Sequence, residues 1–238
     1  MNISQLQKYH FTVIESRGEA LSLPRSSVSI QMISKLLFLS FSATRFCSGV
    51  NMSLKAGNDI VGVGSIVWSS SPDSTDLGWY ALDDVIMGGQ SKSNLPAGSK
   101  FDGIWTGMVT TDGGGGFAGI RTKPFSSPID ASAASGFLLD LTGDGQRYKF
   151  IARDTADYSG VAWATSFDTV PNQRMQIEIP WDMLIPTMRA RKVVSSPFNK
   201  SRISAVQMTL SKFEYDGATS PSFKNGPFRL ELHKISIL

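Results

Sequence analysis

Residues 136–153 read GFLLDLTGDGQRYKFIAR, and this stretch decides the fold class. In its first part, every second residue from 137 to 141 is apolar. A turn signal follows at residues 143–145, after which Tyr148 and Phe150 alternate with basic residues. An alternation with period two is typical of a strand that packs one face on a core and turns the other toward water. The stretch therefore predicts two strands separated by a glycine-rich turn.

The same alternation recurs along the chain after Trp79. Turn signals rich in glycine, proline, asparagine and aspartate separate the runs, and no helical segment of convincing length lies between them. The exception is residues 181–194, where we expect a helical turn followed by a loop. The pattern favours one antiparallel β-sandwich or jelly roll. The further alternating runs are residues 161–167, 175–179, 206–210 and 228–232.

The composition suits a globular protein and argues against a nucleic-acid binder. Of the 238 residues, 41% are hydrophobic and 18% are charged, which permits a sizeable core. The net charge is +3, but residues 1–58 contain six Lys and Arg against two Glu, so that segment carries +4 and the remainder −1. The basic charge thus belongs to the N-terminal segment, which makes it poor evidence for phosphate-backbone binding by the folded part.

Cysteine and histidine are too scarce for most metal and nucleophilic sites. Cys47 is the single cysteine, which excludes a disulfide within the chain and a multi-cysteine metal site. The two histidines, His10 and His233, are too few for a histidine-rich zinc site. A Ser-His-Asp triad would need His233, which lies in an alternating run and is predicted to be an ordinary strand side chain. We therefore predict no catalytic residues, no metal and no cofactor.

The first 58 residues form a predicted leader. No acidic residue occurs from position 20 to 58, serine is frequent, and a short apolar run spans residues 36–41. This composition is typical of an organelle transit peptide, whereas the apolar run is too short for a membrane-spanning helix. A disordered tail is the alternative. Met32 would be a natural start for such a leader, and residues 1–31 are then hypothesised to come from an over-long gene model.

The paired acids Asp83 and Asp84 admit two interpretations. They could serve in acid–base catalysis or hold a cation. Alternatively, they belong to a turn in which Gly88 and Gly89 supply positive φ and the carboxylates cap backbone amides. Because neither a histidine nor a third acid is clustered with them, we favour the turn.

Two other motifs are interpreted as ordinary turns or loops. The run Asp112-Gly-Gly-Gly-Gly-Phe117 lacks the Gly-Lys-Ser/Thr ending of a phosphate-binding P-loop, and it is predicted to be a turn between strands. The basic run at residues 189–192 could meet acidic lipid, RNA or protein, but a solvated loop is the commoner outcome for such a cluster.

Together, these motifs resemble the family of complex I intermediate-associated protein 30. Trp79 with residues 84–91 (DVIMGGQS) resembles the opening signature of that family. Residues 114–121 (GGGFAGIR) resemble its second signature and residues 143–150 (GDGQRYKF) its third. The resemblance covers residues 66–238. It implies an all-β, antiparallel, galactose-binding-like jelly roll and a role in building large membrane-bound electron-transfer complexes.

The C-terminal part resembles one branch of that family, the chloroplast photosystem II biogenesis factors. In those proteins the resemblance implies a second domain, an atypical dehydrogenase-like Rossmann domain. No strand-GxGxxG-helix pattern occurs in this sequence, so that only the jelly-roll part carries over. The stretches that carry this closer resemblance are residues 164–169, 189–191, 210–217 and 226–228.

The family signatures also supply the candidate binding residues. We expect the glycines among them to shape loops and Arg121 to pair with an acid such as Asp84. The seven positions are Asp84, Gly88, Gly89, Ser91, Gly116, Phe117 and Arg121.

The predicted function is that of a non-catalytic assembly factor. Its partners would be protein subunits of a photosystem or of NADH dehydrogenase complex I, or other assembly factors, with peripheral membrane association and no nucleic acid. A carbohydrate-binding module is the alternative, since jelly rolls of this type often bind sugars through loops and exposed aromatics. An enzyme is the weakest interpretation, because no nucleophile–base pair is visible.

The leader and the branch resemblance together predict location. We expect a soluble or peripheral plastid protein near the thylakoid, with the mature chain beginning between Phe46 and Gly64. Mitochondria are the alternative, because the family name links it to complex I there.

Overall fold

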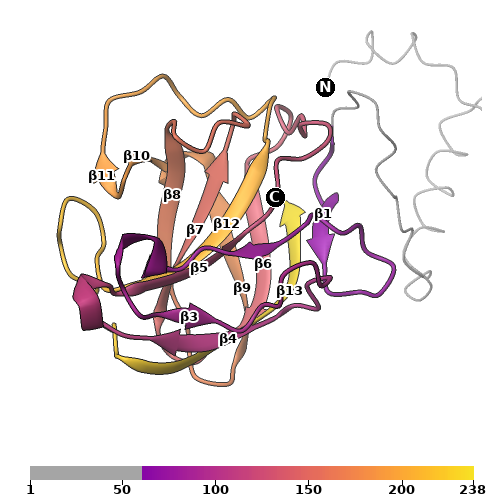
Figure 1. The fold of residues 1–238 in the computed structure, drawn as a ribbon. Coiled ribbons are helices and arrows are strands. Elements are labelled where there is room, and N and C mark those ends of the chain that lie inside the picture. Colours follow the sequence, from indigo (N-terminus) through magenta and orange to yellow (C-terminus); the bar gives the residue numbers. More distant parts are fainter. Residues whose placement is uncertain (1–60) are drawn as a thin grey trace, which may run out of the picture. The chain divides into compact units, whose positions relative to one another are not determined.

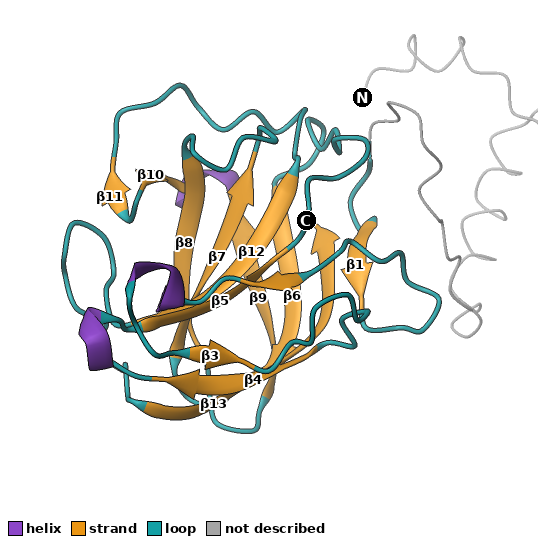
Figure 2. Ribbon diagram, viewed as in Figure 1, coloured by secondary structure: helices purple, strands orange, loops and turns teal. Residues whose placement is uncertain are grey.

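The computed structural model describes residues 61–238, and the predicted leader, residues 1–58, lies outside them (Figure 1). The described part consists of two antiparallel sheets packed face to face (Figures 1 and 2). One sheet has the strand order β3-β4-β13-β6-β9, with β1 also paired to β13, and the other has the order β11-β10-β8-β7-β12-β5-β2. The fold is therefore the predicted all-β antiparallel sandwich.

The six-stranded sheet consists of β1 (Ile66–Ser69), β3 (Lys92–Ser93), β4 (Ile104–Val109), β6 (Gly136–Thr142), β9 (Arg174–Pro180) and β13 (Gly226–Ile237). The seven-stranded sheet consists of β2 (Tyr80–Ala81), β5 (Phe117–Arg121), β7 (Arg147–Arg153), β8 (Ala162–Asp168), β10 (Ile185–Met188), β11 (Arg191–Lys192) and β12 (Ala205–Ser211). Within residues 61–238, three short 3-10 turns complete the elements: η2 (Asp84–Met87), η3 (Asp112–Gly114) and η4 (Trp181–Met183).

The core lies between the sheets and is built from the alternating apolar residues. Phe137 of β6 meets Phe150 of β7 edge to face, with ring centroids 4.9 Å apart. Trp105 of β4 likewise meets Tyr148 of β7 at 5.9 Å. Side chains from both sheets thus interdigitate, and each such aromatic pair contributes about 0.5–1.5 kcal/mol beyond the area it buries.

The two strands of the deciding stretch belong to different sheets. β6 pairs with β9 and β13, whereas β7 pairs with β8 and β12. Residues 143–146 therefore carry the chain from one sheet to the other, and Gly145 adopts φ 91° in this crossing. The predicted glycine-rich turn is present, and it joins two layers of the sandwich.

Two predictions about individual segments have definite outcomes. Residues 181–183 form the predicted helical turn, but the predicted loop after it contains the short strands β10 and β11, which extend the edge of the sheet beside β8. His233 lies in β13, and its Nε2 is 2.9 Å from the Thr142 hydroxyl, as expected of an ordinary strand side chain. Among the described residues, no helix is long and apolar enough to span a membrane.

Candidate binding site

The Asp84 carboxylate joins two of the predicted signatures. Asp84 follows β2 closely and is 0% exposed. Its carboxylate accepts hydrogen bonds from the backbone N–H and the hydroxyl of Ser91, at 2.9 and 2.7 Å. It also accepts the backbone N–H groups of Gly116 and Phe117, at 2.6 and 3.1 Å. One buried side chain thereby fixes η2 and the start of β5 to each other.

The neighbouring carboxylate of Asp83 also joins two segments of the chain through hydrogen bonds. It accepts the backbone N–H and hydroxyl of Ser93, at 2.7 and 2.6 Å, and the backbone N–H of Gly119 at 3.3 Å. The Ser93 hydroxyl also accepts the indole N–H of Trp105 at 3.0 Å. Asp83 thus connects β3 of one sheet to β5 of the other, and the two acids together link the layers at this end.

The glycines of the signatures allow this close approach. A Cβ on Gly89 would overlap the Asp84 carboxylate, and one on Gly113 would overlap the carbonyl oxygen of Gly88. Gly88 ends η2 in the left-handed conformation, with φ 89°. In Figure 1 the two turns appear as the indigo and magenta coils at the left of the sandwich, and in Figure 2 both are purple. The two glycine-rich loops touch backbone to backbone.

The electrostatics of Asp84 follow from these contacts. Burial pushes the pKa of its carboxyl upward, but the hydrogen bonds from Gly116, Ser91 and Phe117 together outweigh burial, and the pKa lies below its ordinary value. The carboxylate is therefore ionised, and donors from protein groups surround it. This confirms the interpretation of Asp83 and Asp84 as caps of backbone amides, and Gly88 has the predicted positive φ. The positive φ predicted for Gly89 is wrong: a glycine is needed there for space beside the Asp84 carboxylate, not for its backbone angle. Within residues 61–238, no group of three His, Cys, Asp or Glu could hold a metal ion.

Arg121 lies apart from this cluster, so the expected pairing with Asp84 is wrong. Arg121 is at the far end of β5, and its Nε donates to the Tyr80 hydroxyl at 2.5 Å. Its guanidinium also lies 3.9 Å from the centroid of the Tyr158 ring. The reason is that Asp84 is bound to Gly116 and Phe117 at the start of β5, four residues or more before Arg121. The structure brings together the other six predicted residues: Asp84, Gly88, Gly89, Ser91, Gly116 and Phe117.

A short apolar segment that is exposed to solvent beside this cluster was not predicted from the sequence. Val85, Ile86 and Met87 follow Asp84 in η2, and they are 58%, 71% and 73% exposed. The signal was available: three consecutive apolar residues stand between paired acids and paired glycines without any alternation. We call these three residues the apolar turn. It is anchored at one end by the buried carboxylate of Asp84 and ended at the other by Gly88.

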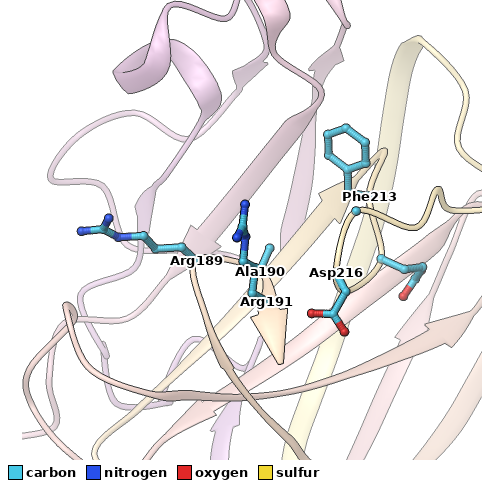
Figure 3. Close-up of a pocket in the computed structure, with 7 residues that line it drawn as sticks. Arg189, Ala190, Arg191, Phe213 and Asp216 are labelled. Atoms are coloured by element: carbon cyan, nitrogen blue, oxygen red, sulfur yellow. The ribbon is translucent and has the colours of Figure 1, made fainter. Parts of the chain in front are cut away.

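A second feature is a hollow of about 520 Å³ between the turn that joins β10 to β11 and the loop after β12 (Figure 3). It is lined by Arg189, Arg191, Phe213 and Asp216 among others. Asp216 ties the two segments together, because its carboxylate accepts the backbone N–H of Lys192 at 2.8 Å. The predicted basic run at residues 189–192 is thus partly a strand, and its two arginines are among the residues that line this hollow.

Lys149 fixes the loop after β12 through hydrogen bonds to its backbone. The Lys149 ammonium donates to the carbonyl oxygens of Phe213 and Glu214. Burial lowers the pKa of Lys149 to about 8. Tyr215 covers the same ammonium, with its ring centroid 4.8 Å from Nζ. Lys149 is therefore occupied in shaping the wall of the hollow.

The solved structures that resemble this chain include carbohydrate-binding modules. The Family 11 Carbohydrate-Binding Module of cellulosomal cellulase Lic26A-Cel5E of Clostridium thermocellum superimposes with a TM-score of 0.50 at 16% identity, over 75% of this chain and 96% of that chain. The same family's module in complex with a β-1,3-1,4-mixed-linked tetrasaccharide, from the same organism, gives a TM-score of 0.48 at 16% identity, over 71% and 94% of the two chains. At this identity the first likeness shows the fold alone, a galactose-binding-like sandwich.

The sequence itself matches a family model. No curated protein matches the chain. Residues 68–232, however, match the model of the family described as Complex I intermediate-associated protein 30. The match covers more than half of the chain and includes all three predicted signatures. The chain belongs to this family.

Proposed function

We propose that this member of the Complex I intermediate-associated protein 30 family is a non-catalytic assembly factor, which binds protein subunits while an organelle electron-transfer complex is built. Family membership supports a role related to the assembly of complex I. The observation that carries the proposal is the apolar turn, Val85–Ile86–Met87, exposed on a rigid anchor.

Exposed apolar side chains on a fixed backbone are suited to binding another protein. Scattered exposed apolar residues are ordinary, but three in succession on one turn form a continuous surface. The hydrogen bonds of Asp84 to Ser91, Gly116 and Phe117 hold this turn in place before any partner arrives. Binding then costs little ordering of the backbone, and more of the energy from burying the side chains remains as affinity.

The proposal is tested by removing the apolar turn. The tagged full chain and a variant carrying Val85→Ser, Ile86→Ser and Met87→Ser are each used to capture proteins from solubilised organelle membranes. Wild-type chain is expected to retain subunits of complex I or of a photosystem, identified by mass spectrometry. The variant should retain at most about a tenth as much, a loss of about 1.4 kcal/mol or more.

A matched control replaces three apolar residues that are exposed elsewhere. Val63, Val170 and Val194 are 75%, 44% and 104% exposed, and a variant with serine at all three should capture subunits as the wild type does. Circular dichroism verifies that both variants are folded. Equal capture by the apolar-turn variant and the wild type would show that this surface is not the contact.

A carbohydrate-binding module is the second candidate. The observation that favours it is a set of partly exposed tyrosines, Tyr80, Tyr158 and Tyr215, that lie over the outward face of the seven-stranded sheet. Aromatic rings with a polar hydroxyl can stack on sugars. A glycan array separates the two candidates: millimolar or tighter sugar binding that is lost on Tyr→Ala substitution supports the module, and its absence supports assembly.

For location we propose the plastid, with the mitochondrion as the alternative. The support is the acid-free composition of residues 20–58 and the resemblance of residues 210–217 to the chloroplast branch. A fusion of residues 32–60 to a fluorescent protein decides between the two. Signal in plastids is the expected result, signal in mitochondria moves the proposed role to complex I there, and signal in the cytosol contradicts the leader.

A further inference from the structure

The geometry points to an oxyanion site on the outward face of the seven-stranded sheet, in which Arg121 and Arg153 with Tyr80 and Tyr158 bind phosphate or a phosphate monoester. The sheet register places the two arginines on one face. Gln207 of β12 pairs with Arg121 on one side and with Ile151 on the other. Arg153 lies two residues beyond Ile151, so its side chain points to the same face.

Tyr158 brings the two guanidinium groups together. Its ring lies 3.9 Å from Arg121 and 5.2 Å from Arg153, measured from each guanidinium carbon to the ring centroid. The Tyr158 hydroxyl donates to the carbonyl oxygen of Thr122 at 2.6 Å, which fixes the ring in this position. Two positive charges are thus held beside one aromatic ring, although like charges repel.

Neither arginine forms an ion pair within the described part of the chain. Arg153 is only 9% exposed, and its buried Nε has no hydrogen-bond partner. Its Nη1 makes only a long contact of 3.4 Å to the Gly160 carbonyl oxygen. A guanidinium this deeply buried is costly unless an anion neutralises it.

Asp157 does not neutralise this pair. Asp157 attracts Arg153 but forms no ion pair with it, and its Oδ1 accepts both the N–H and the hydroxyl of Ser159, at 2.8 and 2.7 Å. Burial, and then the positive charge of Arg121, lowers the pKa of Arg153 below its ordinary value. Both observations describe a place where positive charge remains in excess.

The chemistry of the groups selects a phosphate dianion. Guanidinium donors match carboxylate and phosphate oxygens, and two guanidinium groups balance two negative charges. The Tyr80 hydroxyl accepts the Nε–H of Arg121, which fixes this guanidinium beside the Tyr158 ring. Arg121, Tyr80 and Tyr158 are partly exposed, so an anion reaches the pair from solvent.

The site is separate from the apolar turn, and its failure would leave the proposed assembly function untouched. Arg121 and Phe117 are at opposite ends of β5, about 13 Å apart along the strand at the usual rise per residue. A phosphate ligand here would therefore act beside a protein partner, not in its place.

The test is a titration of the full chain followed through the arginine Nε–H resonances by NMR. Sodium phosphate replaces sodium chloride at constant ionic strength. Saturable shifts of the Arg121 and Arg153 resonances are expected, with a dissociation constant of about 1 mM or lower. Glycerol phosphate is a second arm: tighter binding of the ester assigns the ester as ligand, and equal binding assigns the free ion.

Variants complete the test. Arg121→Gln should weaken phosphate binding about tenfold or more, while the amide spectrum of the variant remains that of a folded protein. The control Arg229→Gln removes an arginine whose guanidinium pairs with Glu231 on the other sheet, and it should bind phosphate as the wild type does. Non-saturating shifts, unchanged binding by Arg121→Gln, or acetate binding as tightly as phosphate would overturn the assignment.

Discussion

Asp84 is the residue on which the local structure of the family signatures depends. Its carboxylate receives donors from segments that are 7 and 32 residues away in the chain. Asp84→Asn would turn an amide N–H₂ toward those donors and leave at least one buried N–H unpaired. We expect a loss of about 3 kcal/mol in the free energy of unfolding, measured by urea denaturation.

An exposed aspartate provides the control for that substitution. The Asp102 carboxylate accepts a single backbone N–H, from Ile104, at the surface. Asp102→Asn should therefore cost less than about 1 kcal/mol. Equal losses for the two variants would contradict the structural role of Asp84.

The pH dependence of stability follows from the same residue. The pKa of Asp84 in the folded protein lies below its ordinary value of 3.8, because the hydrogen bonds outweigh burial, which alone would raise it. A depressed carboxyl pKa contributes stability that is complete above the unfolded-state value and disappears as the pH falls through the folded-state value. The difference in unfolding free energy between the wild type and Asp84→Asn should thus shrink as the pH falls below about 4. A difference that stays constant down to acid unfolding would contradict this.

At the scale of elements, the structure of the site depends on the contact between the two glycine-rich loops. Gly89→Ala places a methyl group on the Asp84 carboxylate, whereas Gly62→Ala has open space around the new atom, and both positions have an ordinary φ. Gly89→Ala should lower the melting temperature by several degrees, since about 1–3 kcal/mol of overpacking is typical. Gly62→Ala should leave it nearly unchanged, and a similar effect of the two changes would contradict the backbone contact.

The loop after β12 depends on Lys149 in the same way. Lys149→Met removes the donor that the carbonyl oxygens of Phe213 and Glu214 share. Hydrogen exchange at the amides of Ala218 and Ser220, which close this loop, should become about tenfold faster or more. The exposed residue Lys92 supplies the control, since Lys92→Met leaves these contacts intact. Unchanged hydrogen exchange in Lys149→Met would mean that Lys149 does not stabilise this loop.

The strands were predictable from the sequence because period two is a local property. Phe137, Leu139 and Leu141 are all buried, as their alternation requires. Partnership between strands is not local, so nothing in residues 136–153 shows that β6 and β7 belong to different sheets. The sequence allowed the prediction that Asp84 caps backbone amides. It could not identify the amides of Gly116 and Phe117, because they are brought to Asp84 by contacts between distant parts of the chain.

The position of Arg121 shows the other limit of sequence reasoning. Opposite charges suggest a pair, but Asp84 is bound at the start of β5 whereas Arg121 lies at its other end, where it contacts Tyr80 and Tyr158. The apolar turn was missed for a related reason. An apolar run suggests burial, and only the caps on either side of Val85–Ile86–Met87 hold these residues outward.

At the scale of the whole molecule, the central claim is that the chain binds an unfinished electron-transfer complex. The most direct measurement separates organelle membrane complexes on a native gel and locates the chain by mass spectrometry. We expect the wild-type chain to migrate with subunits of an intermediate smaller than the finished complex, and the apolar-turn variant to migrate alone. Migration of the wild-type chain alone, with retention on a polysaccharide, would contradict the account.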